Sequence, residues 1–164
     1  MALPNKVLPG FSATLYAQPT STPTPLSTAN LSVYASTSAI AVSGNAIPVE
    51  AIPAFGQDDA VANFSVAGSR QSDKIPVQSA PTSMTITAAW NPSDTNLLLL
   101  RADAYNGTID RTFVISATDG TGIVNYAFNG RVGQWTVDNA PGAEAKVTFT
   151  IHPRGNQYGW SNNT

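Results

Sequence analysis

The sequence predicts a mainly β protein, a sandwich or barrel of about seven strands with one flanking α-helix. Apolar and polar residues alternate in several short runs, for example at 84–90 and 143–152, as they do in half-buried strands. Segments rich in Pro, Gly, Ser and Asn separate these runs. One Leu-rich segment, 95–105, lies between a capping signal and an Asn-Gly pair, which predicts the helix.

The first half of the chain predicts strands at 11–18 and 31–42, separated by a Pro/Ser/Thr-rich loop at 19–30. Residues 46–68 predict a projecting hairpin with an acidic tip at 56–59. Its first arm contains Pro48 and Pro53, and because proline cannot donate to a β-ladder, we expect an edge or irregular strand there. The polar segment 69–82, which also contains prolines, predicts a loop.

The second half predicts strands arranged around the helix. The strand at 84–90 stops at Asn91-Pro92, after which Ser93 or Asp94 can cap the helix by accepting a free backbone N–H. We expect Asn106-Gly107 to end the helix. The remaining predicted elements are strands at 110–117, 122–130 and 143–152, turns at 118–122 and 138–142, a bulge or bend at Gly130 and Gly133, and a polar tail at 153–164.

Four successive leucines, at 97–100, cover every side of one helical turn. Burying a leucine side chain is worth about 1.5–3 kcal/mol, so leaving one or two of them in water forgoes much of that stabilisation. One arrangement buries one face of the helix on the sheet and another against a second subunit. The alternative is a helix sunk between two sheets of one sandwich.

The composition limits the possible functions of the 164 residues. There is no cysteine, so disulfides and thiolate metal sites are excluded. A net charge of −2 gives no sign of bulk attraction to nucleic acid. Charged residues are only 11%, which suits a surface largely covered by neighbouring subunits, although a composition typical of the source organism would read the same way. We expect one domain and no membrane span.

Residues that could carry chemistry are few. His152 lies on the polar face of a predicted strand, where a solvated or interface histidine is favoured over a general base. Asp58, Asp59 and the turn at 119–122 do not match the ligand spacing of a calcium loop, which favours ordinary turn aspartates. We therefore predict no catalytic, cofactor-binding or metal-binding residue, no cofactor, and a protein that is not an enzyme.

The order of features from 84 to 152 resembles that of the tail tube proteins (major tail proteins) of long, flexible-tailed bacteriophages of the lambda type. The matching features are an alternating strand ending in Trp90, a Leu-rich helix, the Asn106-Gly107 turn, and the segments YAFNGRV at 126–132 and VTFTI at 147–151. The chain departs from lambda's subunit in its Pro/Thr-rich stretch at 19–30. It also stops soon after the last predicted strand, without the immunoglobulin-like C-terminal domain.

The resemblance implies a barrel-like or sandwich-like core, with copies that form hexameric rings and rings that stack into a hollow conduit for DNA ejection. It implies as partners identical copies, other tail proteins at the tube ends, and double-stranded DNA that passes without specific binding, and no membrane. It implies a place in the virion tail after assembly in the host cytoplasm. The alternative is a β-sandwich module of the virion that binds the host or a glycan. The tube of a contractile injection machine is a closely related possibility.

On this resemblance, residues 1–152 would form the tube domain and 153–164 a tail that docks on an adjacent copy. The hairpin at 46–68 and the loop at 69–82 are expected to make contacts between rings. The candidate residues for subunit contacts or for the lumen are Glu50, Asp58, Asp59, Asp119, Asp138, Leu98, Leu99, Tyr158 and Trp160.

Overall fold

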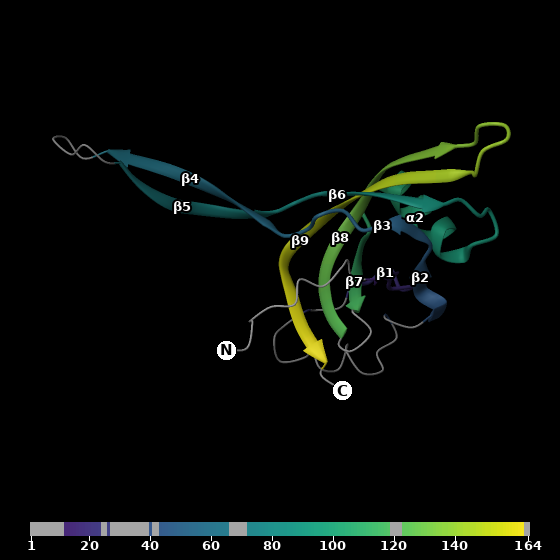
Figure 1. The fold of residues 1–164 in the computed structure, drawn as a ribbon, viewed down its shortest axis with the longest axis horizontal. Helices are drawn as coiled ribbons and strands as arrows, with labels where there is room; N and C mark the ends of the chain where they lie inside the picture. Colours follow the sequence, from purple (N-terminus) through teal and green to yellow (C-terminus); the bar gives the residue numbers. More distant parts are fainter. Residues whose placement is uncertain are drawn as a thin grey trace, which may run out of the picture.

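The computed structural model describes residues 12–23, 26, 40, 43–65, 72–118 and 123–162. These residues form a compact body from which one two-stranded arm projects (Figure 1). Along the chain the elements are β1 (Ser12–Ala17), a 3-10 turn η1 (Ser43–Asn45), β2 (Ala46–Ile47), β3 (Val49–Ala51), β4 (Gln57–Ser65), β5 (Ser72–Pro81), β6 (Met84–Ala89), α2 (Thr95–Asn106), β7 (Asp110–Thr118), β8 (Ile123–Asp138) and β9 (Lys146–Asn162). The predicted strand at 31–42 and turn at 118–122 fall almost entirely outside the described residues.

Seven strands form one antiparallel sheet in the order β2-β1-β7-β8-β9-β6-β3. The two end strands, β2 and β3, are separated in the chain by Pro48 alone, so the segment 46–51 joins both ends and the sheet wraps into a barrel. Proline has no N–H for the ladder, and here the strand leaves β1 and pairs next with β6. The Pro48 carbonyl accepts a hydrogen bond from the Ala89 N–H at 3.0 Å. The predicted mainly β barrel or sandwich with one helix is confirmed.

The core of the barrel is made by alternate residues of its strands. In β6, for example, Met84, Ile86 and Ala88 are buried, as the alternation in the sequence predicts. Packed with them are large apolar side chains from the facing strands, chiefly Leu15, Phe113, Ile115, Phe128, Val147, Phe149 and Ile151. A smaller cluster around Val114 and Ala127 lies on the outer face of β7 and β8, where Ile40 and Leu26 cover it.

Helix α2 begins and ends as the sequence predicts. The Asp94 carboxylate accepts hydrogen bonds from the Asn96 N–H at 2.9 Å and the Leu97 N–H at 3.2 Å, so Asp94 is the N-cap. Gly107 takes a left-handed conformation, with φ of 67°, and donates to the Asp103 carbonyl, which ends the helix. Leu97 and Leu100 are fully buried in the barrel core, so α2 packs against the barrel rather than between two sheets.

The predicted hairpin at 46–68 and loop at 69–82 are wrong. The arm consists of β4 paired with β5, from Gln57↔Pro81 at its base to Ser65↔Ser72, while the segment 46–51 belongs to the barrel. The prolines explain the error, because they predict a loop. In a two-stranded ribbon each strand has an outer edge without a ladder, and prolines are tolerated there and at bulges. The register of the arm shifts between Ala60 and Val61, which opposes Pro76.

The predicted tail at 153–164 is also wrong as far as Asn162. Strand β9 continues through Pro153 to Asn162 because the first half of β8 offers it a partner, with Tyr158 opposite Ala127 and Trp160 opposite Asn125. Pro153 lies beside a register shift, where a missing N–H is tolerated. The predicted bulge near Gly133 is confirmed by the register shift between Gly133 and Thr136.

We expect the substitution Gly130→Ala to lower the free energy of unfolding by about 1–3 kcal/mol. A Cβ at Gly130 would lie 3.0 Å from Cγ2 of Ile151 and 3.3 Å from the His152 carbonyl oxygen, so packed core atoms would have to move. Denaturant unfolding monitored by tryptophan fluorescence measures the change. Gly44→Ala is the matched control, because nothing lies within 4 Å of its Cβ position. Equal effects of the two substitutions would contradict the packing argument.

Candidate assembly surface

The arm β4–β5 is a two-stranded sheet of its own and stands away from the barrel (Figure 1). Ala60, Val61 and Ala62 on β4 are exposed, Val61 at 49%. A two-stranded ribbon without a third strand or a helix against it is only marginally stable in water. The arm therefore has the properties of a segment that becomes stable by packing against another molecule.

Two hydrogen bonds lie at the base of the arm. The Thr82 N–H donates to the Gly56 carbonyl at 3.0 Å, which brings the two ends of the arm together. The Ser83 hydroxyl and Nδ1 of His152 lie 2.9 Å apart in a hydrogen bond, which links the start of β6 to β9. His152 is exposed, in agreement with a surface histidine, and its bonded role is to hold the join between arm and barrel.

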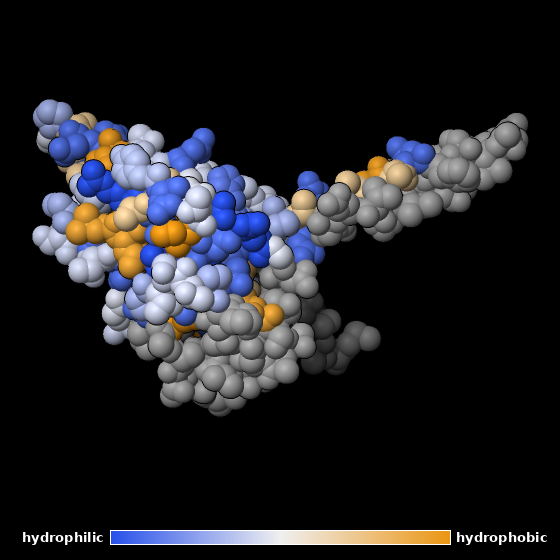
Figure 2. Space-filling model, turned by 180° about the vertical axis from the view of Figure 1, so that it is seen from behind, coloured by the Kyte–Doolittle hydropathy of each residue, from blue (hydrophilic) through white to orange (hydrophobic). Residues whose placement is uncertain are grey.

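One side of α2 faces outward and carries Leu98, Arg101, Ala102 and Tyr105, which we call the helix stripe. Leu98 is 39% exposed and Tyr105 is 72% exposed, while the Arg101 guanidinium lies over the Tyr105 ring at 5.7 Å. Figure 2 shows apolar side chains gathered on the body surface at the end where α2 lies. The leucine run is thus divided, with Leu98 pointing to solvent and Leu99 packed partly against the core of its own chain.

The helix stripe is held in place by a buried ion pair that sequence reasoning missed. Asp103 and Arg111 are 2% and 4% exposed, and two guanidinium nitrogens of Arg111 donate to the two carboxylate oxygens of Asp103. Arg111 also donates to the carbonyls of Gln18 and Pro19, at 3.2 and 2.9 Å. This one side chain therefore joins α2, β7 and the chain just after β1.

A second, more exposed network fixes the C-terminal end of α2. The Asp110 carboxylate accepts from Arg131 and from Arg154, both at 2.9 Å. Arg131 also donates to the carbonyls of Gly107 and Thr108, which follow the helix. The orientation of the helix stripe is therefore set by bonds to three barrel strands, β7, β8 and β9.

Of the predicted acidic candidates whose side chains the structure describes, Glu50 and Asp138 both lie near Lys146, and Asp58 lies on the arm. Glu50 forms an ion pair with Lys146, and the Glu50 carboxylate, by its hydrogen bond and its charge, raises the pKa of the Lys146 ammonium. Asp138 is exposed at the end of β8 and also faces Lys146. Asp58 is exposed on the arm, and the backbone of Asp59 lies beside it in β4. Asp119 lies outside the described residues.

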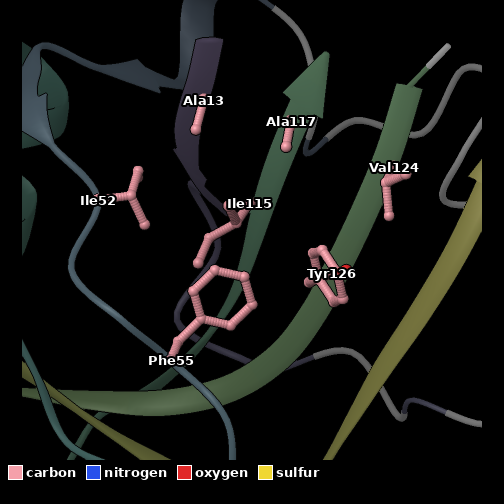
Figure 3. Close-up of a pocket in the computed structure, with 7 residues that line it drawn as sticks. All are labelled: Ala13, Ile52, Phe55, Ile115, Ala117, Val124 and Tyr126. Carbon is pink, nitrogen blue, oxygen red and sulfur yellow. The ribbon is translucent and has the colours of Figure 1, made fainter. Parts of the chain in front are cut away.

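The two ends of the barrel differ. At one end Leu97 and Leu100 of α2 enter the core. At the other end a cavity of about 270 Å³ is lined by Ala13, Ile115, Ala117, Val124 and Tyr126 of the barrel strands and by Ile52 and Phe55 of the segment after β3. Figure 3 shows these side chains directed toward one shared space. The lining is apolar apart from the hydroxyl of Tyr126, so the cavity, called here the barrel cavity, suits an apolar side chain rather than a charged ligand.

Among all the residues that the structure describes, no three acidic or histidine side chains gather closely enough to hold a metal ion. Within that same part of the chain, no helix has the length and hydropathy that crossing a membrane requires.

No family model and no curated protein sequence matches the chain. Its fold, however, matches solved structures of phage tails and injection systems over nearly its whole length. It is similar to a chain of the anti-feeding prophage baseplate, with a TM-score of 0.64, 12% identity, and 98% and 97% of the two chains covered. It is also similar to a chain of the sheath/tube terminator of an extracellular contractile injection system, PVC, with a TM-score of 0.66, 13% identity, and 96% and 99% covered.

A third likeness is to the SPP1 tail tube, with a TM-score of 0.55, 11% identity, and 93% of this chain and 77% of that chain covered. The chain has a tail tube-like fold. At such low identities the likeness establishes the fold and leaves the role to be argued from the chain's own features. Among the residues that the structure describes, the arm and the helix stripe are exposed surfaces of this fold.

Proposed function

We propose that the chain is a structural subunit of a phage tail tube, in which hexameric rings of identical copies stack into a hollow conduit for DNA. The observation that carries the proposal is the arm β4–β5, a ribbon that stands clear of the barrel with exposed apolar residues at 60–62. Such a ribbon gains stability by lying against a neighbouring copy. The tail tube-like fold supports this role, and it supports a protein that is structural rather than catalytic.

The closed barrel directs how copies can associate. The segment 46–51 contains the two end strands of the sheet, β2 and β3, which are only 2 and 3 residues long, whereas the arm strands β4 and β5 have 9 and 10 residues, so the arm presents longer outer strand edges. We expect axial contacts between rings to use the arm, and lateral contacts to use the helix stripe with Leu98. Head-to-tail stacking of this kind does not close on itself, so it produces a filament.

The low charge of the chain is consistent with a DNA conduit. Only 11% of residues are charged and the net charge is −2, so a lumen built from this chain would not hold the DNA backbone by counterion release. Glu50, Asp58, Asp59, Asp119 and Asp138 remain our candidates for lumen or inter-ring positions, and Tyr158 and Trp160 remain candidates for contact with an adjacent copy. We infer a place in the virion tail, with the subunit assembling in the host cytoplasm. For the lambda-like flexible tail type, the support is the sequence resemblance at 84–152.

A second candidate is a component of the tube end, which forms a ring but does not polymerise. It is favoured by the similarity to a baseplate chain and to a sheath/tube terminator chain, because each comparison covers nearly the whole of this chain and of the other chain. The two candidates share the fold and the helix stripe and differ in whether one ring accepts another ring on both of its faces.

Negative-stain electron microscopy of the concentrated protein tests the proposal. We expect rings and tubes, and we expect Leu98→Asp to shift the protein to dispersed monomers at the same concentration, because it places a charge in the apolar part of the helix stripe. Ser93→Asp is the matched control, with the same charge at an exposed position just before α2, and it should leave assembly unchanged. Single rings would favour the tube-end component, while monomers with measurable sugar affinity would contradict both and support the glycan-binding alternative.

A further inference from the structure

The outer face of the barrel carries a surplus of positive charge where Arg131 and Arg154 meet Asp110, and we call these three residues the basic face. The Asp110 carboxylate accepts from both guanidiniums, at 2.9 Å each, so one anion serves two cations. Arg131 directs its other donors to the carbonyls of Gly107 and Thr108. The Arg154 side chain is 56% exposed, and within the part of the chain that the structure describes its ion pair is with Asp110 alone. Arg154 therefore has no carboxylate of its own.

The region around the turn between β8 and β9 carries the opposite surplus, and we call it the acidic turn. Glu50, Asp138 and Glu144 are exposed there, and Lys146 is the one cation among these four side chains. The pKa of the Lys146 ammonium is raised by Glu50 first, and also by Glu144 and Asp138, as expected for an ammonium surrounded by carboxylates. Three carboxylates and one ammonium leave two negative charges exposed to solvent.

The basic face and the acidic turn of one chain lie too far apart to neutralise each other. Lys146 and Arg154 belong to the same strand, β9, and the eight steps between them span about 26 Å. Charges in water are screened over about 8 Å at physiological salt. Figure 1 shows the turn between β8 and β9 at the opposite end of the molecule from the arm. The basic face lies nearer the base of the arm, since Arg131 stands opposite His152, which is bonded to Ser83.

We propose that the basic face binds the acidic turn of a second copy of the chain, with Arg154 meeting the carboxylates of Glu144 and Asp138. The inference rests on the proposed function in taking the partner to be an identical chain. Charge complementarity selects this occupant, because both surfaces are exposed and opposite in sign. One surplus cation is too little to hold a DNA backbone, which proteins bind by neutralising several phosphates. An arginine fork instead matches a single carboxylate.

The contact directs assembly more than it holds the assembly together. Exposed ion pairs add little affinity, but complementary charges speed the encounter of two molecules and fix their relative orientation. Because two different surfaces meet, the contact is head-to-tail and can continue from copy to copy. The helix stripe then supplies apolar burial, and the basic face determines which surfaces meet. The rate of assembly should fall as salt rises, because exposed charges are screened.

Charge reversal tests the inference, with assembly of the full chain followed by light scattering at low salt. Arg154→Glu should slow assembly about tenfold, because it brings an acidic face against the acidic turn. The pair Asp138→Lys with Glu144→Lys should slow it similarly, because two cationic surfaces then meet. The triple variant restores opposite charges and should assemble at close to the rate of the unaltered chain. It is the matched control, since it contains every substitution of the two slow variants. The unfolding midpoint of each variant shows whether its barrel is intact.

A mixture of the two slow variants provides a second measurement. The acidic turn of the Arg154→Glu chain fits the intact basic face of the other variant, and the two reversed surfaces fit each other, so the mixture should assemble faster than either variant alone. Rates equal to that of the unaltered chain in every variant, or no recovery in the triple variant and the mixture, would overturn the inference. Tubes of the unaltered chain would then still support the proposed function. An unaltered chain that does not self-associate would overturn both.

Discussion

Replacing residues 57–81 by a short Gly-Ser linker is expected to leave a folded barrel that no longer assembles. The two ends of the arm meet at the hydrogen bond between the Thr82 N–H and the Gly56 carbonyl, at 3.0 Å, so a short linker joins them without displacing the barrel. The arm pairs with itself and forms a sheet separate from the barrel. Because a shorter connection costs little loop entropy, we expect the free energy of unfolding to change by about 1 kcal/mol or less. Rings and tubes should disappear in electron micrographs.

Val61→Asp in the intact arm is the companion variant, because Val61 is exposed at 49% and its replacement places a charge on β4 without shortening the chain. We expect shorter or fewer tubes and an unchanged unfolding midpoint. Loss of the barrel fold in the linker variant would show that the arm belongs to the core. Tubes of normal length in both variants would remove the arm from the assembly contacts and with it the main support for the proposed function.

Between residues 84 and 152, local signals were sufficient to predict most of the elements. The alternation at 84–90 predicted β6, Asp94 and Gly107 predicted the two ends of α2, and the glycines near Gly133 predicted a bulge. Each of these depends on neighbours in the sequence, such as a cap three residues away or a side chain two residues along. The outward direction expected for part of the leucine run was also found, at Leu98.

The errors fall where pairing partners are distant in the sequence, or where a proline that predicts a loop lies in a strand instead. Nothing local shows that Gln57 pairs with Pro81, or that the residues around Tyr158 meet those around Ala127. The segment around Pro48 was predicted to project, but the same missing N–H lets it leave one end of the sheet and pair with the other. Closure of the barrel depends on pairing between segments that are distant in the sequence, so no short stretch of the sequence predicts it.

The buried ion pair was missed although both of its residues carry a signal. Arg111 has the same parity as Phe113 and Ile115, the inward residues of β7, and Asp103 follows Leu97 and Leu100 at a spacing of three along the helix. A cation and an anion that lie on the buried faces of two consecutive elements are expected to form an ion pair, because a lone buried charge is very unfavourable. Neither residue stands among the predicted site residues.

We expect Asp103→Asn to lower the free energy of unfolding by about 3–5 kcal/mol, because it leaves the Arg111 guanidinium buried without an anionic partner. A domain of this size has a total stability of about 5–15 kcal/mol, so the variant loses a large part of it. The anchor of the helix stripe is lost at the same time, so assembly should weaken even where the barrel remains folded. Urea unfolding at a concentration that keeps the protein monomeric measures the first effect, and the yield of tubes measures the second.

Asp110→Asn is the matched control, since it removes the same charge from a carboxylate that also binds arginines but is far less buried. Its expected cost is about 1 kcal/mol or less, because exposed ion pairs contribute little. The double variant Asp103→Leu with Arg111→Met should recover part of the lost stability by removing both charges, while the carbonyls of Gln18 and Pro19 lose the donor that Arg111 provides. Similar costs for Asp103→Asn and Asp110→Asn would show that the buried pair does not anchor α2 to the barrel.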